Sequence, residues 1–171
     1  MSAVSENENA YSPIYPTNVA VEDRLKHFIS TFYAVSDDPS RNEEWVEAFF
    51  APEAVVKIGK NMARGHNEMR KMRAQMWEKG EYPPYWMPSS LLIRYERVVE
   101  SRRHKPEKVY PASFPQGSPS TPGQYEYMIM GSVDMEMKDG EEITIPWAAR
   151  AVVRVCEGLL KYTFYQVYIS Y

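Results

Sequence analysis

The sequence has few of the residues that several common kinds of site require. Its 171 residues include one cysteine and three histidines. A single thiol, Cys156, cannot form an internal disulfide, and no cysteine–histidine cluster of the kind that binds structural zinc is present. Because Cys156 follows Val153 and Val155 in an apolar run, we expect it to be a small buried residue, and we expect no metal site.

Excess positive charge and long apolar runs are also missing. The net charge is -3 and the pI is about 5.7, with lysines and arginines scattered along the chain, so nucleic acid is not an expected partner. No stretch is long and apolar enough to cross a bilayer. The polar segment Met1 to Ala20 lacks the apolar core of a signal peptide. We therefore expect a cytoplasmic protein that binds no membrane.

The first half of the chain has a helical pattern. Residues 1–20 contain Pro13 and Pro16 among polar residues, which predicts a flexible tail, although tyrosines there could dock onto the body. From Val21, apolar residues recur at three- and four-residue spacing, which predicts a helix that closes at Asp37. Two more helices are predicted around a short hairpin, at about 40–51 and 66–79.

The second half reads as strands. Alternating apolar residues predict four of them, at 86–101, 125–137, 143–155 and 159–171. Tight turns at Asp139-Gly140 and Glu157-Gly158 separate the last three. Residues 102–122 are rich in proline, serine and glycine, and we predict a surface insertion there.

This order of elements predicts an α+β fold in which three N-terminal helices pack on a curved, mostly antiparallel sheet. Several short runs also have a familiar form: Trp45 to Phe50 followed by Pro52-Glu53-Ala54, Gly65 before the third helix, Gly131-Ser132-Val133, Trp147-Ala148-Ala149-Arg150, and Tyr165-Gln166-Val167-Tyr168. Together they resemble the SnoaL-like branch of the nuclear-transport-factor-2-like (NTF2-like) superfamily, fungal members especially, over residues 21–171. The resemblance implies a cone with an apolar pocket for a small organic molecule, and a homodimer.

Enzymes with this cone commonly use a carboxylate as a base. The resemblance makes Asp37, at the end of the first helix, the candidate, although an aspartate before Pro39 also serves as an ordinary turn residue. Asp134 is a second option, on a face that we expect to be partly solvated. Arg150 lies in an otherwise apolar strand and needs a partner, which is a ligand oxygen or a structural carboxylate. Gln166, within an aromatic strand, would orient a carbonyl or hold a core hydrogen bond.

We expect the pocket to be lined by apolar, aromatic and long side chains suited to a polycyclic or prenylated molecule. The predicted lining residues are Tyr33, Phe49, Met72, Arg73, Met76, Trp77, Tyr127, Trp147 and Tyr168. Most of these residues also suit an ordinary core, and Arg73 could extend to solvent instead.

Histidines contribute little to this prediction. His66 follows Gly65 at a helix start, where capping is its simpler role, and His104 falls in the predicted insertion. Related dehydratases are expected to carry pocket histidines on the sheet, and the strand start Trp86 to Ser90 has none, which argues against dehydration by that scheme.

Three kinds of function remain open. The first is a cofactor-free isomerase, cyclase or dehydratase of secondary metabolism that acts on a polyketide- or terpenoid-like substrate, with Asp37 as the base and Tyr33, Gln166 or Arg150 polarising an oxygen. The second is a noncatalytic ligand-binding or dimerisation module of the same fold, which an Asp37 found outside the cavity and pointing into water would favour. The third is a purely structural protein whose cavity is filled by its own aromatic side chains.

Overall fold

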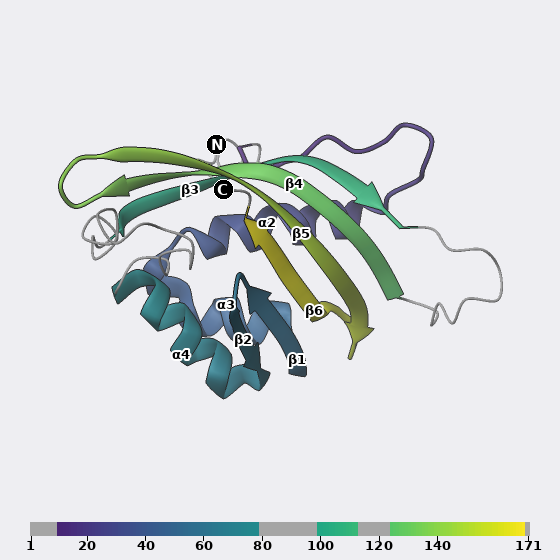
Figure 1. The fold of residues 1–171 in the computed structure, drawn as a ribbon. Helices are drawn as coiled ribbons and strands as arrows, with labels where there is room; N and C mark the ends of the chain where they lie inside the picture. The colour runs from purple at the N-terminus through teal and green to yellow at the C-terminus, as the bar shows by residue number, and fades with distance from the viewer. Residues whose placement is uncertain (1–9, 79–98, 113–123, 170–171) are drawn as a thin grey trace, which may run out of the picture.

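A curved sheet of six strands covers the α-helices in the computed structural model, which describes residues 10–78, 99–112 and 124–169 (Figure 1). The elements in chain order are α2 (Asp23–Ser36), the 3-10 turn η1 (Pro39–Arg41), α3 (Asn42–Phe49), β1 (Phe50–Ile58), β2 (Asn61–Arg64), α4 (Gly65–Glu78), β3 (Val99–Pro111), β4 (Gln124–Met137), β5 (Glu142–Cys156) and β6 (Leu159–Ile169). Among the described residues no helix is both long and apolar enough to cross a bilayer.

The sheet has the order β2-β1-β6-β5-β4-β3, so the first two strands and the last four form one surface. Strands β1 and β6 are parallel, and every other neighbouring pair is antiparallel. The long strands β3 to β6 curve over α2, while α3 and α4 lie beside β1 and β2 (Figure 1). The predicted α+β cone is confirmed.

The core lies between α2 and the concave face of the sheet. Leu25, Phe28, Ile29, Phe32 and Val35 recur at three- and four-residue spacing on α2, and all are buried. The ring of Phe32 packs 4.8 Å from that of Tyr162. Burying one such side chain contributes about 1.5–3 kcal/mol, so this stripe is enough to fix the helix against the sheet.

A bulge in β6 changes which of its residues face the core. Val152 pairs with Phe164, but Val153 pairs with Tyr162, so one extra residue lies in β6 at this point. As a result Tyr162 and Tyr165 both point inward and are buried, although simple alternation would place them on opposite faces. The bulge decides which side of the sheet the later residues of β6 face.

Residues 102–111, which we predicted to be part of a surface insertion, belong to strand β3. The prediction was wrong because proline and charge were taken as signs of a loop. An edge strand tolerates prolines and charged residues, since its outer side needs no complete ladder of hydrogen bonds. Pro106 lies where the register with β4 shifts. The rest of the predicted insertion and most of the predicted strand 86–101 lie outside the described residues.

The N-terminal segment also differs from the prediction over the residues that the structure describes. Ile14 forms a parallel bridge with Lys108 on the free edge of β3, with hydrogen bonds of 2.7 and 3.0 Å to the strand. Tyr11 is buried against the core. Residues 10–15 therefore dock on the body rather than form part of a flexible tail. Cys156 is half-buried at the end of β5, less enclosed than expected.

Candidate functional site

The site is built around the C-terminal end of α2. Pro39 disfavours a helical backbone at Asp38, whose φ and ψ are -105° and 108°, so the helix stops at Ser36 and Asp37 becomes its C-cap. A helix end leaves carbonyl groups without intrahelical partners. Those carbonyls must be satisfied from elsewhere in the fold, because this end of α2 is buried.

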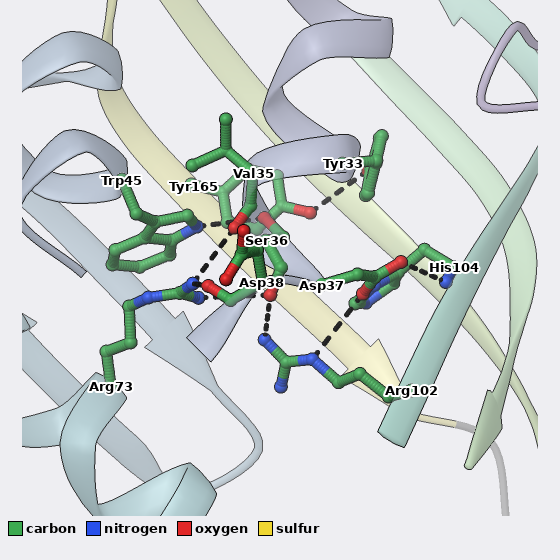
Figure 2. Close-up of polar contacts among 10 residues, drawn as sticks. All are labelled: Tyr33, Val35, Ser36, Asp37, Asp38, Trp45, Arg73, Arg102, His104 and Tyr165. Atoms are coloured by element: carbon green, nitrogen blue, oxygen red, sulfur yellow. Dashed lines mark hydrogen bonds and ion pairs between the residues drawn. The ribbon is translucent and has the colours of Figure 1, made fainter. Parts of the chain in front are cut away.

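Two buried arginines supply the missing donors. The Arg73 guanidinium, on α4, donates to the carbonyl oxygens of Val35 at 3.0 Å, Ser36 at 3.2 Å and Asp38 at 2.8 Å. Arg102, on β3, donates to the Ser36 carbonyl at 2.5 Å (Figure 2). Burial, and then the positive charge of Arg102, lowers the pKa of Arg73 to about 9, which leaves it protonated at neutral pH. The arginines hold the helix end, and with it Asp37, in place.

Asp37, which is buried, and His104, which is partly buried, form a pair at this helix end. One carboxylate oxygen of Asp37 lies 2.5 Å from Nδ1 of His104, and the other accepts the backbone N–H of His104 at 2.6 Å. Because β3 is the last strand of the sheet among the described residues, no described strand accepts that N–H. Arg102 Nε lies 3.5 Å from the same carboxylate, whose side chain is 5% exposed. A carboxylate acceptor at Nδ1 fixes the proton there and leaves Nε2 of the ring as an acceptor.

His104 faces a cavity between α2, α4 and the sheet. Its lining comprises Phe32, Tyr33, Ser36, Trp45, Ile58, Arg73, Met76, Arg102, His104, Val133, Ile145, Trp147, Tyr165, Val167 and Ile169. The His104 ring packs against the rings of Tyr33 and Trp147, at centroid distances of 5.4 and 5.8 Å. About 50 Å³ is free, so a ring-sized ligand requires flexible side chains of the lining, Met76 among them, to move.

Two pairs of tyrosines are buried, and one of them, Tyr33 with Tyr165, belongs to the cavity wall. The hydroxyls of Tyr33 and Tyr165 are 3.1 Å apart, and those of Tyr127 and Tyr162 are 2.8 Å apart. Burial raises the pKa of each of these phenols well above the ordinary value, so all four are neutral donors near neutral pH. Tyr11 also interacts with the Asp37 carboxylate. Burial, followed by the negative charge of Asp37, raises the pKa of Tyr11 to about 12.

The structure brings some of the predicted site residues together. Tyr33, Arg73, Met76 and Trp147 line the cavity. The others do not. Phe49, Met72 and Tyr127 are buried in the core without appearing in the cavity wall, and Trp77 is half-buried with its ring 4.3 Å from the guanidinium of Arg102. His66 hydrogen-bonds the backbone carbonyl of Phe50 at 3.0 Å.

Arg150, Gln166 and Tyr168 were wrongly predicted to face the pocket. Trp147 lines the cavity, so Arg150, three residues further along β5, points to the opposite face. Its side chain is 46% exposed and pairs with Glu126 at 2.7 Å. Gln166 is the cross-strand neighbour of Arg150, so it shares that outer face with Tyr168. For Gln166 and Tyr168 the bulge in β6 explains the wrong prediction, because it breaks the alternation that starts at Tyr162.

Sequence reasoning missed Arg102 and His104 because both were assigned to a loop. The usable signal is their spacing, since residues two apart on a strand share a face. A histidine does lie on the sheet, at His104 of β3, so the lack of one at Trp86 to Ser90 no longer argues against dehydration. Asp134, the alternative carboxylate, pairs with Lys105 and accepts from Thr144 at 2.8 Å, away from the cavity lining.

Neither family models nor curated protein sequences match the chain. Solved structures do. A Novosphingobium aromaticivorans protein, provisionally assigned as a scytalone dehydratase, aligns with a TM-score of 0.64 at 10% identity over 86% of this chain and 83% of its own. The type 3 LinA hexachlorocyclohexane dehydrochlorinase of Novosphingobium barchaimii aligns with 0.60 at 7% identity over 86% and 85%. A Streptomyces avermitilis protein, provisionally a dehydratase of the NTF2-like family, aligns with 0.62 at 10% identity over 87% and 95%.

At these identities the likeness concerns the backbone and not the chemistry of any one neighbour. It covers most of this chain and most of each neighbour. The protein has the NTF2-like cone fold that its sequence resembles.

Proposed function

We propose that the protein is a cofactor-free acid–base enzyme in which His104, held by Asp37, removes a proton from a carbon atom of a small organic substrate. The observation that carries this proposal is the partly buried contact of 2.5 Å between Asp37 and Nδ1 of His104, on the wall of a largely apolar cavity. A carboxylate at Nδ1 leaves the basic Nε2 for the substrate and stabilises the imidazolium formed when it accepts a proton.

In the reaction, Nε2 of His104 takes the proton, and the electron pair of the C–H bond forms a new double bond. That pair either expels a leaving group, as in an elimination, or moves to an adjacent oxygen until the proton is returned elsewhere, as in an isomerisation. All three structural neighbours described above carry names that denote elimination, one a dehydrochlorinase and two dehydratases, which favours the first outcome. The positive charges of Arg73 and Arg102 suit either kind of developing anion.

The alternative of a noncatalytic binding module predicted that Asp37 would lie outside the cavity and point into water. Asp37 itself does not line the cavity, but it contacts His104, which does. Its carboxylate is 5% exposed and has a histidine and an arginine as partners. A buried, paired carboxylate beside an imidazole suits acid–base work, although it also stabilises the helix end. The catalytic proposal is therefore the better supported one.

A general carbon acid tests the proposal without knowledge of the natural substrate. Nitrobenzisoxazole opens when a base removes its ring proton, and the nitrogen–oxygen bond then breaks to give a coloured phenolate. We expect the wild-type protein to accelerate this reaction, and His104→Gln to lose about 100-fold or more of the acceleration. His66→Gln, a change of the same kind outside the cavity wall, is the matched control. Equal rates for wild type and His104→Gln would refute the proposal.

The finer predictions on substrate and setting remain part of this proposal. A polyketide- or terpenoid-like molecule of secondary metabolism, handled in the cytoplasm, suits an apolar cavity with a few polar groups. The small free volume favours one ring over a polycyclic body, because fewer side chains of the lining must move to admit it. Homodimerisation through the outer sheet face is supported by its partly exposed Met128, Met130 and Tyr168, and native mass spectrometry tests it.

A further inference from the structure

The polar groups of the cavity are mostly hydrogen-bond donors. Arg73, Arg102 and the indole of Trp147 offer only N–H groups, whereas Nε2 of His104 is an acceptor in the tautomer that Asp37 imposes. Trp45 also offers an N–H, but it is engaged with the Ser36 hydroxyl at 2.9 Å. A ligand that complements this wall supplies acceptor oxygens together with one acidic hydrogen.

One of these donors is conspicuous because it is buried and unused. Trp147 is 6% exposed, and its Nε1 has no hydrogen-bond partner among the described residues. Leaving such a donor unsatisfied costs about 1–3 kcal/mol, so a buried indole N–H normally finds an acceptor. The Trp147 ring is next to the proposed base, with its centroid 5.8 Å from that of His104.

The ring of Trp147 is held in position from two sides. It packs 5.3 Å from the ring of Tyr33, and on the sheet side it lies over Gly131. A Cβ at Gly131 would lie 2.9 Å from the ring, so the absence of a side chain there makes room for the indole. A donor fixed in this way does not need to reorganise when charge develops on a ligand.

We propose that the indole N–H of Trp147 binds an oxygen of the substrate, and that this oxygen receives the negative charge when His104 removes a proton. The inference rests on the proposed function and narrows its substrate class to carbon acids whose acidic C–H is adjacent to a carbonyl group or conjugated with one. The proton moves to His104, the C–H electron pair forms a carbon–carbon double bond, and the former carbonyl pair resides on the oxygen. Arg73, with its Nε also lacking a hydrogen-bond partner among the described residues, adds positive charge at the same cavity.

An oxyanion analogue tests the proposal by binding alone. Titration of the nitrogen-15-labelled protein with para-nitrophenolate is followed through the indole N–H signals of its tryptophans. We expect the Trp147 signal to move downfield as the phenolate binds, and the Trp45 signal, already bonded to Ser36, to stay in place. Para-nitrotoluene has a similar shape and lacks the phenolate oxygen, so it should bind more weakly and leave the Trp147 signal without a downfield shift.

Trp147→Phe keeps an aromatic ring and removes the N–H. It should weaken para-nitrophenolate binding by about tenfold or more, as expected for a hydrogen bond to a charged acceptor, and change para-nitrotoluene binding little. Circular dichroism and the melting temperature of the variant establish that it folds; if it does not, the indole signal of the wild-type protein decides alone. An unmoved Trp147 signal at saturation with phenolate would overturn this inference while leaving the His104 proposal standing. A moved Trp147 signal together with the full wild-type rate in His104→Gln would overturn the His104 proposal and leave oxygen binding by Trp147 standing.

Discussion

Replacing Asp37 with asparagine separates the chemical role of this residue from its structural one. The amide keeps the shape of the carboxylate, and its oxygen can still accept the backbone N–H of His104, which now bonds at 2.6 Å. Its NH₂ group then points at Nδ1 as a donor. An imidazole that accepts at Nδ1 carries its proton on Nε2, so the proposed base is lost although the ring stays in place.

The magnitudes follow from the geometry. Changing the carboxylate partner of a catalytic histidine to an amide lowers the rate by about 10⁴-fold in serine proteases, and we expect a loss of about 10³- to 10⁴-fold here. The lost ion pair with Arg102, at 3.5 Å, has a gross Coulomb energy of about 5 kcal/mol at an effective dielectric constant of about 20. Since the amide retains one hydrogen bond, we expect about 3 kcal/mol of net destabilisation, which a domain of ordinary stability tolerates.

Two assays read these effects separately. The rate of nitrobenzisoxazole opening measures the base, and urea denaturation measures the free energy of unfolding. We expect Asp37→Asn to remain folded with a lower urea midpoint and a greatly reduced rate. A variant that folds and retains the wild-type rate would refute the reasoning about the tautomer, whatever its stability.

Four further predictions concern other parts of the molecule. The buried tyrosine pairs keep their phenols neutral in the folded state, so their contribution to stability is complete below about pH 10. Above that pH the free energy of unfolding falls by about 1.4 kcal/mol per pH unit for each hydroxyl, and denaturant midpoints should fall steeply. Tyr127→Phe should lower the free energy of unfolding by about 1–3 kcal/mol, because it leaves the Tyr162 hydroxyl without its hydrogen-bond partner. Adding Tyr162→Phe should restore most of that free energy, which a double-mutant cycle of unfolding measures. Gly131→Ala should reduce the free energy of unfolding by about 1–3 kcal/mol, and so lower the melting temperature, because the added Cβ overpacks against the backbone of β3 and the ring of Trp147. Arg150→Met, on the outer face, should leave the rate of nitrobenzisoxazole opening unchanged.

Local patterns were sufficient to predict the main elements from the sequence. The three- and four-residue spacing on α2, the break at Asp38-Pro39 and the turns at Gly140 and Gly158 each have a local physical cause. Asp37 could be singled out for the same reason, since the helix had to end there. These features depend on residues close to one another in the chain, and a sequence displays them directly.

The partners of Asp37 could not be found in this way. His104 is 67 residues away along the chain and lies on an edge strand whose charges and prolines look like a loop. The bulge in β6 is equally hidden, because it appears only as a register shift against β5, and it moved Gln166 to the outer face. Both errors come from pairing between strands, which the alternation within a single strand does not specify.

The tautomer of His104 tests the central claim most directly. Nitrogen-15 spectra of the imidazole rings distinguish a nitrogen that carries a proton from one that does not, and only three histidines need assignment. The account predicts that neutral His104 carries its proton on Nδ1, bonded to Asp37, and that Asp37→Asn moves it to Nε2. A proton on Nε2 in the wild-type protein would contradict the account, because the cavity would then face a donor where the proposed base should be.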